Sequence, residues 1–321
     1  MEFRLGLIEE AIIAKKQHNT FVLMNQYIVK QCEPLPLKSK FIIFGGGYSG
    51  QKIATIGRNL GVKVLCSRRT KGSKGADFVF NSDKKFSNEI LEDATHVLSC
   101  IPPLANGKDP VLSRLKTQLL NLKSLQWVGY LSTTGVYGDT NGKWVTESTP
   151  PNPLQERSIR RFSCEKEWLE TNLPIQILRL PGIYGPKRSP FESLLNGTTK
   201  MIDKPGQVFS RIHVDDIAGA VLFLINLYSQ GKNPPVVNVT DNLPTNNLEV
   251  IEFAAKLAKK SLPSTVPFDI AKKTMSPMAL SFWKENRKVD NKLLCKELGY
   301  SLLYPNFKSG LKDCFSKLKF N

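Results

Sequence analysis

Residues 41–50 read Phe-Ile-Ile-Phe-Gly-Gly-Gly-Tyr-Ser-Gly, and this run constrains the fold more than any other feature of the chain. Gly45, Gly47 and Gly50 match the pattern G-x-G-x-x-G, which joins a buried strand to a helix in nucleotide-binding proteins. The first glycine permits a tight turn, the second lets the backbone approach a pyrophosphate, and the third allows close packing of helix on strand. Apolar residues precede the glycines as a strand would and follow them at helical spacing, so the sequence predicts dinucleotide binding.

The end of the second expected strand indicates which dinucleotide is bound. NAD-binding units usually carry Asp or Glu about 20 residues beyond the glycines, where it accepts a hydrogen bond from the ribose 2′-hydroxyl. This chain has Arg68 and Arg69 there instead, and their planar guanidinium groups suit the 2′-phosphate of NADP. NADP is the favoured cofactor, with NAD as the alternative, and a solvated basic loop is the other interpretation of the arginines. The predicted cofactor-binding residues are Gly45, Gly47, Tyr48, Ser49, Gly50, Arg68, Arg69, Ile101, Pro102, Thr133 and Pro181.

Strand and helix patterns alternate along most of the chain. This alternation predicts an α/β protein of the Rossmann class, a doubly wound, mostly parallel sheet with helices on both faces. We expect an N-terminal extension at 1–39, a Rossmann NAD(P)-binding domain at 40–180, and a smaller, interleaved C-terminal substrate-binding region at 181–321. Strands are expected at 41–44, 62–66, 76–80, 96–101, 127–131, 175–180 and 236–239, the last rejoining the sheet, and helices near 111–122, 157–170, 214–229 and 247–260.

The N-terminal extension has a pattern of its own. Leu5, Ile8 and Ile12 recur at helical spacing and predict an amphipathic helix. Two interpretations stay open: a helix that docks on a partner, or additional sequence upstream of a start at Met24.

Composition narrows the class of protein without deciding the function. The 45 Lys and Arg residues against 28 Asp and Glu give a net charge of +17, but the charges are scattered, so a compositional bias or an anionic substrate explains them better than nucleic acid. Six cysteines without a C-x-x-C pair predict no disulfides and a reducing, cytoplasmic location. Three histidines without ligand spacing predict no metal site, and no apolar run approaches membrane-spanning length.

Further motifs follow the glycine run in a recognisable order. Residues 130–138 read Tyr-Leu-Ser-Thr-Thr-Gly-Val-Tyr-Gly, residues 179–186 read Arg-Leu-Pro-Gly-Ile-Tyr-Gly-Pro, and residues 211–218 read Arg-Ile-His-Val-Asp-Asp-Ile-Ala. Together with a turn at 146–153, they resemble extended short-chain dehydrogenase/reductases, the group of nucleotide-sugar epimerases and dehydratases. The resemblance covers residues 40–240 and implies a Rossmann fold with a bound NAD(P).

The resemblance also implies where catalysis takes place. Members of this family use a Ser or Thr at the end of the fifth strand and a Tyr-x-x-x-Lys on the next helix. Thr133, four residues ahead of Tyr137, matches the hydroxyl position and is expected to bind the reacting oxygen. The Tyr-x-x-x-Lys is missing, as in atypical members of the family. Tyr137 and Tyr184 border the expected cleft and are candidate proton donors, although such tyrosines are more often core residues.

Two alignments of the next helix place different residues in the Tyr and Lys positions. Aligned without gaps from the preceding turn, Arg157 and Arg161 stand there, whereas anchoring on Glu167 gives Ile159 and Ser163. Arg161 could bind the nicotinamide ribose or a substrate anion. It cannot donate a proton, because the pKa of arginine stays above roughly 12.

The motif at 211–218 marks the start of a helix. Asp215 or Asp216 is expected to cap that helix, with His213 packed beneath it. Sugar-nucleotide enzymes hold the substrate pyrophosphate with an arginine upstream of this histidine. Arg211 lies only two residues upstream, so the resemblance does not extend to a nucleotide-sugar substrate.

These observations predict an NAD(P)-binding oxidoreductase or epimerase-like protein, with NADP preferred and a small or anionic molecule as substrate. Thr133, Arg161 and Tyr137 are the predicted catalytic residues. The alternative is a non-catalytic NAD(P)-binding sensor or scaffold, which the missing Tyr and Lys favour.

Overall fold

The computed structural model describes residues 26–31, 33, 35–36, 38–70, 72–81 and 86–318. The amphipathic helix expected around Leu5 to Ile12 and the candidate start at Met24 lie outside the described residues. A helical turn at 26–29 is tied to the C-terminal part of the chain, because the Tyr27 hydroxyl donates to the carbonyl oxygen of Ser301 at 2.6 Å.

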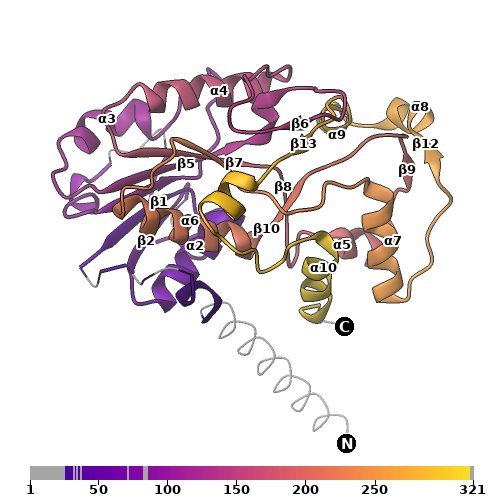
Figure 1. Ribbon diagram of the computed structural model, residues 1–321, viewed down its shortest axis with the longest axis horizontal. Coiled ribbons are helices and arrows are strands. Elements are labelled where there is room, and N and C mark those ends of the chain that lie inside the picture. Colours follow the sequence, from indigo (N-terminus) through magenta and orange to yellow (C-terminus); the bar gives the residue numbers. More distant parts are fainter. Residues whose placement is uncertain are drawn as a thin grey trace, which may run out of the picture.

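A seven-stranded sheet forms the centre of the molecule, and all its neighbouring strands run parallel (Figure 1). The strand order is β11-β7-β5-β4-β1-β2-β3. Along the chain, β2 and β3 are added on one side of β1 and the later strands on the other, so the order of addition switches side between β1 and β4. In such sheets ligands bind beside the carboxyl ends of the strands, at the point of this switch. The predicted Rossmann-like α/β fold is confirmed. The strands are β1 (Lys40–Phe44), β2 (Lys63–Arg68), β3 (Phe78–Val79), β4 (His96–Ser99), β5 (Trp127–Thr133), β7 (Ile175–Leu180) and β11 (Val236–Asn238).

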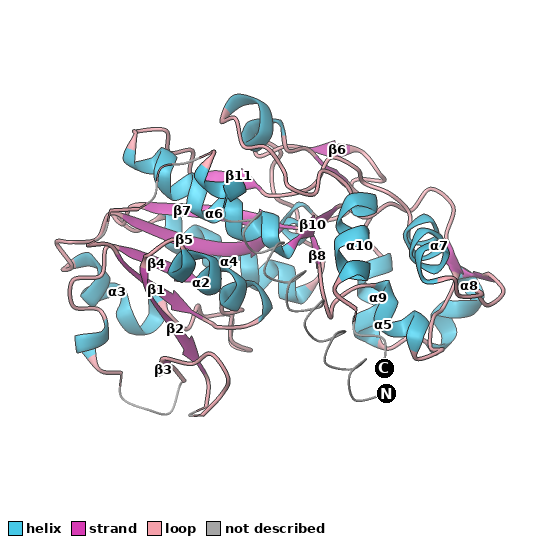
Figure 2. Cartoon of the chain, turned by 90° about the horizontal axis from the view of Figure 1, so that it is seen from below, coloured by secondary structure: helices cyan, strands magenta, loops and turns pink. Residues whose placement is uncertain are grey.

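Helices cover both faces of this sheet and also extend beyond one end of it (Figures 1 and 2). The helices are α2 (Tyr48–Asn59), α3 (Leu112–Leu120), α4 (Glu156–Leu169), α5 (Pro190–Leu195), α6 (Val214–Ser229), α7 (Asn247–Ala258), α8 (Phe268–Ala271), α9 (Pro277–Trp283) and α10 (Phe307–Ser316), with short 3₁₀ or π turns at Asn88–Ile90, Thr134–Tyr137, Lys272–Thr274 and Leu293–Glu297. Because the sheet is covered on both sides, its central strands are almost continuously buried.

The register of the parallel strands aligns their carboxyl ends. Phe44 at the end of β1 is paired with Ser99 of β4, which is in turn paired with Tyr130 of β5. The loops that follow these three strands therefore leave the sheet side by side. They supply most of the site described below.

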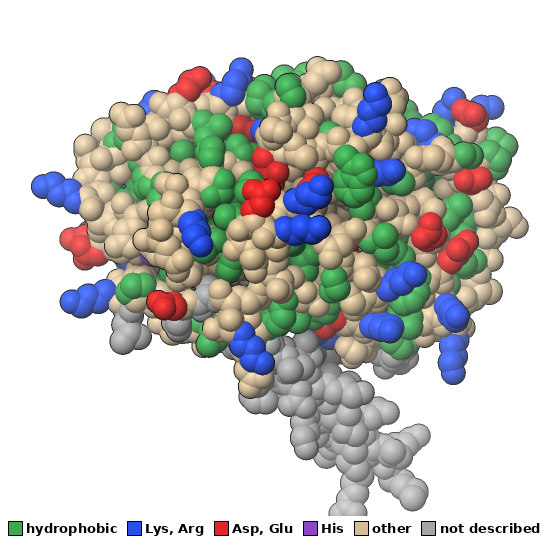
Figure 3. Space-filling view, in the orientation of Figure 1, with side chains coloured by type: hydrophobic (Ala, Val, Ile, Leu, Met, Phe, Trp, Pro, Cys, Tyr) green, Lys and Arg blue, Asp and Glu red, His purple; other side chains and the backbone are tan. Residues whose placement is uncertain are grey.

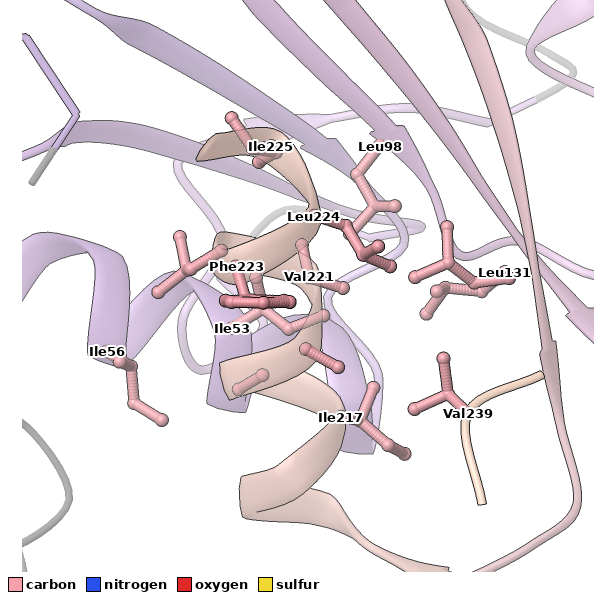
Figure 4. Close-up of a cluster of buried hydrophobic side chains, with 14 of the residues drawn as sticks. Ile53, Ile56, Leu98, Leu131, Ile217, Val221, Phe223, Leu224, Ile225 and Val239 are labelled. Carbon is pink, nitrogen blue, oxygen red and sulfur yellow. The ribbon is translucent and has the colours of Figure 1, made fainter. Parts of the chain in front are cut away.

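Two apolar layers hold the sheet in place. On one face, Ile53 of α2, Val221 of α6 and Leu98 of β4 belong to a single buried cluster (Figure 4). On the other face, α3 and α4 pack in the same way, with Trp168 of α4 fully buried. Helix α6 is buried around most of its circumference, and Tyr300 packs on its Phe223 with 5.3 Å between the ring centres.

The C-terminal helices form a second, smaller core. Helices α5, α7 and α10 pack together to the right of the sheet in Figure 1, and in Figure 2 β8 and β10 lie between the sheet and this group. The boundaries of the expected regions stay a prediction, but α6 and β11 both follow residue 181 and both lie on the sheet. Three short parallel pairs complete the fold: β8 (Gly182–Tyr184) with β10 (Arg211–His213), β6 (Trp144–Val145) with β13 (Lys288–Val289), and β9 (Ile202–Asp203) with β12 (Val266–Pro267).

The charges of this basic chain are dispersed over the face shown in Figure 3, where Lys and Arg side chains lie among acidic and apolar ones. No helix within the described ranges is long and apolar enough to cross a membrane. In the same part of the chain, the cysteines are free thiols at positions 66, 100, 164, 295 and 314.

Candidate functional site

The glycine run forms the turn from β1 into α2, and this turn depends on the absence of side chains. Gly45 adopts a φ of +99°, which residues with a side chain rarely do. A Cβ on Gly50 would lie 2.3 Å from the carbonyl oxygen of Gly45, so a side chain there would force α2 away from β1. A Cβ on Gly47 would meet no atom of the described residues within 4 Å. The N–H groups of the first turn of α2 therefore face open space, where they can bind an anion.

A groove of about 370 Å³ lies along the carboxyl ends of β1, β2, β4 and β5. The glycine turn forms one side of it, and the residues at the other strand ends form the rest. Nine predicted cofactor-binding residues line this groove, namely Gly45, Gly47, Tyr48, Ser49, Gly50, Arg68, Arg69, Ile101 and Pro102. The other two, Thr133 and Pro181, line the neighbouring cavity.

The groove is cationic where the second strand ends. Arg68 and Arg69 line it, and no carboxylate among the described lining residues faces them. The acid nearest to them in sequence is Asp77, whose carboxylate accepts hydrogen bonds from the backbone N–H of Cys66 at 2.6 Å and from Arg58 at 2.5 Å. The Nε of Arg68 is buried and has no partner within the described part of the chain. A donor is thus left for an acceptor group of a ligand.

A larger cavity of about 710 Å³ adjoins the groove, and the two share Pro102, Arg161, Ile183 and Arg188. Among the described residues, its charged lining consists of six arginines and one carboxylate, that of Glu285. Guanidinium groups bind carboxylates and phosphates through paired hydrogen bonds, so this lining favours an anion. The arginines are Arg157, Arg160, Arg161, Arg188, Arg211 and Arg287.

Helix α4 contributes Arg157, Ser158 and Arg161 to the cavity. Arg157 and Arg161 are four residues apart and therefore lie on the same face of the helix. Arg161 is directed toward the sheet, where its Nη1 donates to the carbonyl oxygen of Leu131 at 2.9 Å. The gap-free alignment, which puts Arg157 and Arg161 in the Tyr and Lys positions, therefore places two cavity residues there. The other alignment puts Ile159 in the Tyr position, and Ile159 is half exposed and lines neither the groove nor the cavity.

Thr133 and Tyr137 belong to one motif but lie in different environments. Thr133 lines the cavity, and its Oγ1 accepts a hydrogen bond from the backbone N–H of Gly135 at 3.1 Å. Tyr137 is fully buried, and its hydroxyl donates to Oδ1 of Asn238 at 2.8 Å. Burial raises the pKa of this phenol. The geometry argues against the predicted catalytic role of Tyr137, because the turn after β5 directs its side chain into the core.

Tyr184, the other candidate phenol, does line the cavity. Its hydroxyl donates to the carbonyl oxygen of Asn306 at 3.4 Å, and its ring packs edge-on against His213 with 5.2 Å between ring centres. Burial raises the pKa of this phenol far above its usual range. A packing role therefore explains Tyr184 better than proton transfer.

His213 itself begins helix α6. Its Nδ1 accepts a hydrogen bond from the backbone N–H of Asp215 at 3.2 Å, so the histidine is the cap and the expectation of an aspartate cap was wrong. Asp215 and Asp216 lie instead in the first turn of the helix, where negative charge is favourable.

A buried group of charges surrounds this helix start. His213, Asp215 and Asp313 each place one potential metal ligand within 4.8 Å of the others. However, Lys52 lies 2.7 Å from the Asp215 carboxylate and Lys317 lies 2.8 Å from that of Asp313. The two ammonium groups already neutralise the two carboxylates, and burial lowers the pKa of His213 to about 4, so this histidine is neutral. We interpret the group as an ion-pair network that joins α2, α6 and α10.

Among the described arginines of the cavity, Arg211 is the buried one, and carbonyl oxygens of the backbone hold its guanidinium in place. Its Nη1 donates to the carbonyl oxygens of Phe209 at 2.9 Å and Thr245 at 3.0 Å. Burial lowers the pKa of Arg211 to about 10, so it stays charged at neutral pH. The backbone N–H of Asp241 donates to the carbonyl oxygen of Arg211 at 2.8 Å, and burial raises the pKa of the Asp241 carboxyl to about 7.

Several cavity residues were not singled out by the sequence. Arg188 follows the motif at 179–186 by two residues, and its basic character directly after that motif is a signal that could have identified it. Glu285 and Arg287 lie in the irregular tail of the chain and belong to no motif.

Comparison with known proteins now complements this geometry. No protein-family model and no curated protein sequence matches the chain. Among solved structures, the chain is similar to a conserved protein of unknown function from Silicibacter pomeroyi, with 38% identity, a TM-score of 0.77, and coverage of 86% of this chain and 98% of that one. A putative NAD-dependent epimerase/dehydratase from Methylobacillus flagellatus gives 23% identity, a TM-score of 0.65, and coverage of 86% and 97%. The human epimerase family protein SDR39U1, solved with NADPH, gives 16% identity, a TM-score of 0.67, and coverage of 87% and 100%.

The fold and its structural neighbours define the class, a Rossmann-like α/β protein with the fold of NAD(P)-binding epimerases and dehydratases. The identity of 38% to the S. pomeroyi protein extends over most of both chains. The chain therefore belongs to the same family as the S. pomeroyi protein and has the fold of NAD-dependent epimerases and dehydratases, so the resemblance inferred from its motifs is confirmed.

Proposed function

We propose that this protein is an NADP-dependent oxidoreductase of the short-chain dehydrogenase type that acts on a small anionic substrate. The observation that carries the proposal is the arginine-lined cavity that adjoins the glycine groove. Arg161 and Arg188 line both spaces, so a ligand in one lies next to a ligand in the other.

The residues of the groove fit NADP. Gly47 leaves open space at the start of α2 for a pyrophosphate. Arg68 and Arg69 offer guanidinium groups for a 2′-phosphate, and no carboxylate among the described lining residues would repel it. The human relative of this fold was solved with NADPH, which supports the same assignment.

The cavity residues would position the substrate. When bound, NADPH would supply a hydride to a carbonyl carbon of the substrate that the protein holds beside it, and the resulting alkoxide oxygen would take its proton from water. Thr133 would hydrogen-bond the reacting oxygen, while Arg161 and Arg211 would neutralise the substrate anion. The guanidinium of Arg161 would bind and orient the substrate rather than transfer a proton.

Nucleotide binding tests the proposal first. Melting of the purified full chain should be followed with NADPH, NADP, NADH and NAD, for the wild type and for Arg68→Ala/Arg69→Ala. A ligand at about 100 times its Kd adds about 2.7 kcal/mol to stability, so a melting shift with NADPH is expected in the wild type and a much smaller one in the double variant. Lys256→Ala/Lys260→Ala removes one exposed cation from α7 and one just beyond its end, and should leave the shift unchanged. The proposal fails if no nucleotide shifts the melting temperature.

The second candidate is a non-catalytic NADP-binding sensor. It is favoured by the arginines that replace the Tyr and Lys of α4 and by the buried position of Tyr137. This candidate predicts nucleotide binding without NADPH consumption. Oxidation of NADPH in the presence of any small anionic aldehyde or ketone would exclude it.

A further inference from the structure

One carboxylate breaks the cationic character of the large cavity. Glu285 is its single acidic residue among those described, and the side chain of Glu285 is only 6% exposed. Its Oε2 pairs with Nη1 of Arg287 at 2.7 Å. Its Oε1 is buried and has no hydrogen-bond partner within the described part of the chain.

The backbone around Glu285 is held from several sides. The carbonyl oxygen of Glu285 accepts a hydrogen bond from Nε2 of Gln207 at 2.9 Å. The next side chain, Asn286, accepts from the backbone N–H of Val208 at 3.1 Å, and β13 pairs with β6 directly afterwards. Arg287 also donates to the carbonyl oxygen of Gly138 at 2.6 Å. The carboxylate is thus fixed in place before any ligand arrives, as a recognition group should be.

An unpaired buried acceptor needs an explanation. Leaving such a group without a donor costs free energy, and native proteins rarely accept that cost without a function. The cavity wall near Glu285 already contains guanidinium donors, but Arg287 binds the other oxygen and the Arg157 guanidinium stacks on the Phe282 ring at 4.0 Å. The missing donor therefore has to come from a molecule in the cavity, and a hydroxyl group of a ligand can supply it in place of water.

We propose that Glu285 and Arg287 form a subsite that accepts a hydrogen bond from a hydroxyl group of the anionic substrate. The substrate class is then a hydroxylated anion, such as a polyol or sugar phosphate. The placement of the substrate in this cavity rests on the function proposed above. A hydroxyl fits better than an ammonium group, because the arginines around the subsite repel a second positive charge.

Three phosphates of equal chain length test the subsite without any cofactor. Binding of glycerol 3-phosphate, propyl phosphate and 3-aminopropyl phosphate to the full chain is measured by calorimetry, in a buffer free of phosphate and sulfate. The wild type should bind glycerol 3-phosphate about tenfold more tightly than propyl phosphate, as expected for a hydrogen bond to a charged acceptor. It should bind 3-aminopropyl phosphate the most weakly.

Variants at position 285 show whether the carboxylate is responsible. Glu285→Met should bind glycerol 3-phosphate and propyl phosphate with equal affinity. Its affinity for propyl phosphate should be at least that of the wild type. Glu285→Gln is the safer variant for folding, keeps one acceptor oxygen, and should reduce the preference at least threefold. Glu252→Gln, which changes an exposed glutamate on α7, is the matched control and should keep the full preference.

Several outcomes overturn the inference. The inference fails if the wild type binds glycerol 3-phosphate no more tightly than propyl phosphate, or if it binds none of the phosphates at millimolar concentration. Tightest binding of 3-aminopropyl phosphate would also overturn it. So would an undiminished preference for glycerol 3-phosphate in both Glu285→Met and Glu285→Gln. The two proposals can fail separately. A preference that depends on Glu285 in a chain that does not bind NADPH would disprove the oxidoreductase and leave the subsite standing. NADPH turnover by a protein that shows no preference for a hydroxylated phosphate would disprove the subsite and leave the oxidoreductase standing.

Discussion

The cofactor groove and the substrate cavity lie side by side, yet they are built in different ways. The groove is formed by residues that directly follow consecutive strands, and much of its surface is backbone at Gly45, Gly47 and Gly50. The charged lining of the cavity consists of long side chains from α4, the loop after β8, β10 and the segment before β13. A backbone-lined site tolerates little change in the chain that forms it. A side-chain-lined site can change its ligand while the fold stays constant.

The largest expected effect concerns the backbone of the groove. Gly50→Ala should lower the free energy of unfolding by about 4 kcal/mol, at the upper end for single substitutions, because its Cβ would lie 2.3 Å from the carbonyl oxygen of Gly45. Gly47→Ala should cost less than about 1 kcal/mol, since its Cβ meets open space, but it should abolish the melting shift with NADPH. Denaturant unfolding and melting curves separate the two effects. Equal stability of both variants would show that the turn is not the rigid part of the site.

The next effect concerns the charges buried behind the cavity. The pKa of Asp241 is raised from 3.8 to about 7 by burial, so the folded protein holds a proton in this range that the unfolded chain releases. The stability that this group contributes is fully present below its unfolded pKa and is lost as pH rises through its folded pKa. Asp241→Asn is neutral at every pH and keeps an oxygen for the backbone N–H of Leu243.

Urea unfolding at several pH values measures this difference. The free energy of unfolding of Asp241→Asn, taken relative to that of the wild type, should rise by roughly 3 kcal/mol as the pH increases from about 4 to about 8. A difference that does not change with pH would mean that the carboxyl is hydrated rather than buried.

Arg188 offers a test of whether the two spaces act together. It lines the groove and the cavity, and its guanidinium lies 5.6 Å from the centre of the Tyr48 ring. Arg188→Met should raise the Kd values of both NADPH and inorganic phosphate by about tenfold to thirtyfold. Arg160→Met is the control, because Arg160 lines the cavity alone and should affect phosphate only. An unchanged Kd for NADPH in Arg188→Met would separate the two sites.

The smallest expected effect is at Thr133. Thr133→Ala removes one neutral hydroxyl from the cavity wall, so kcat should fall roughly threefold to tenfold with little change in KM. Thr133→Ser keeps the hydroxyl and should retain most of the activity. Steady-state NADPH oxidation with the first anionic substrate found provides the measurement. An unchanged kcat in Thr133→Ala would remove this residue from the mechanism.

The fold was predictable because its signals are local. A strand such as β1 is a run of buried apolar residues. The turn after it requires glycines because side chains would clash there, and this steric requirement is the same in any chain that makes the turn. Element ends were less predictable. The third strand was expected at 76–80 but is only Phe78–Val79, and the cap of α6 is a histidine, a residue outside the usual capping set.

The site was predictable on the groove side and largely hidden on the cavity side. Arg68 and Arg69 could be found because they lie a known distance beyond the glycines. Glu285 and Arg287 reach the cavity through β13, a two-residue strand that pairs with an equally short β6. Pairings of this length produce no periodicity in the sequence, and only the folded chain shows that they bring residue 287 to residue 138.

The path of the chain through the sheet limits how this protein can be recombined. After β10, the chain goes back to supply α6 and the edge strand β11 before it completes the cavity. A fragment that stops at residue 180 would leave the apolar surface around Ile53 and Leu98 without the helix that covers it. A substrate cavity from a relative would therefore have to be grafted as two separate inserts, one between β8 and β10 and one after β11. The native α6 and β11 would stay between them, and Leu294 and Tyr300 would be kept because they belong to the same buried cluster as Ile53.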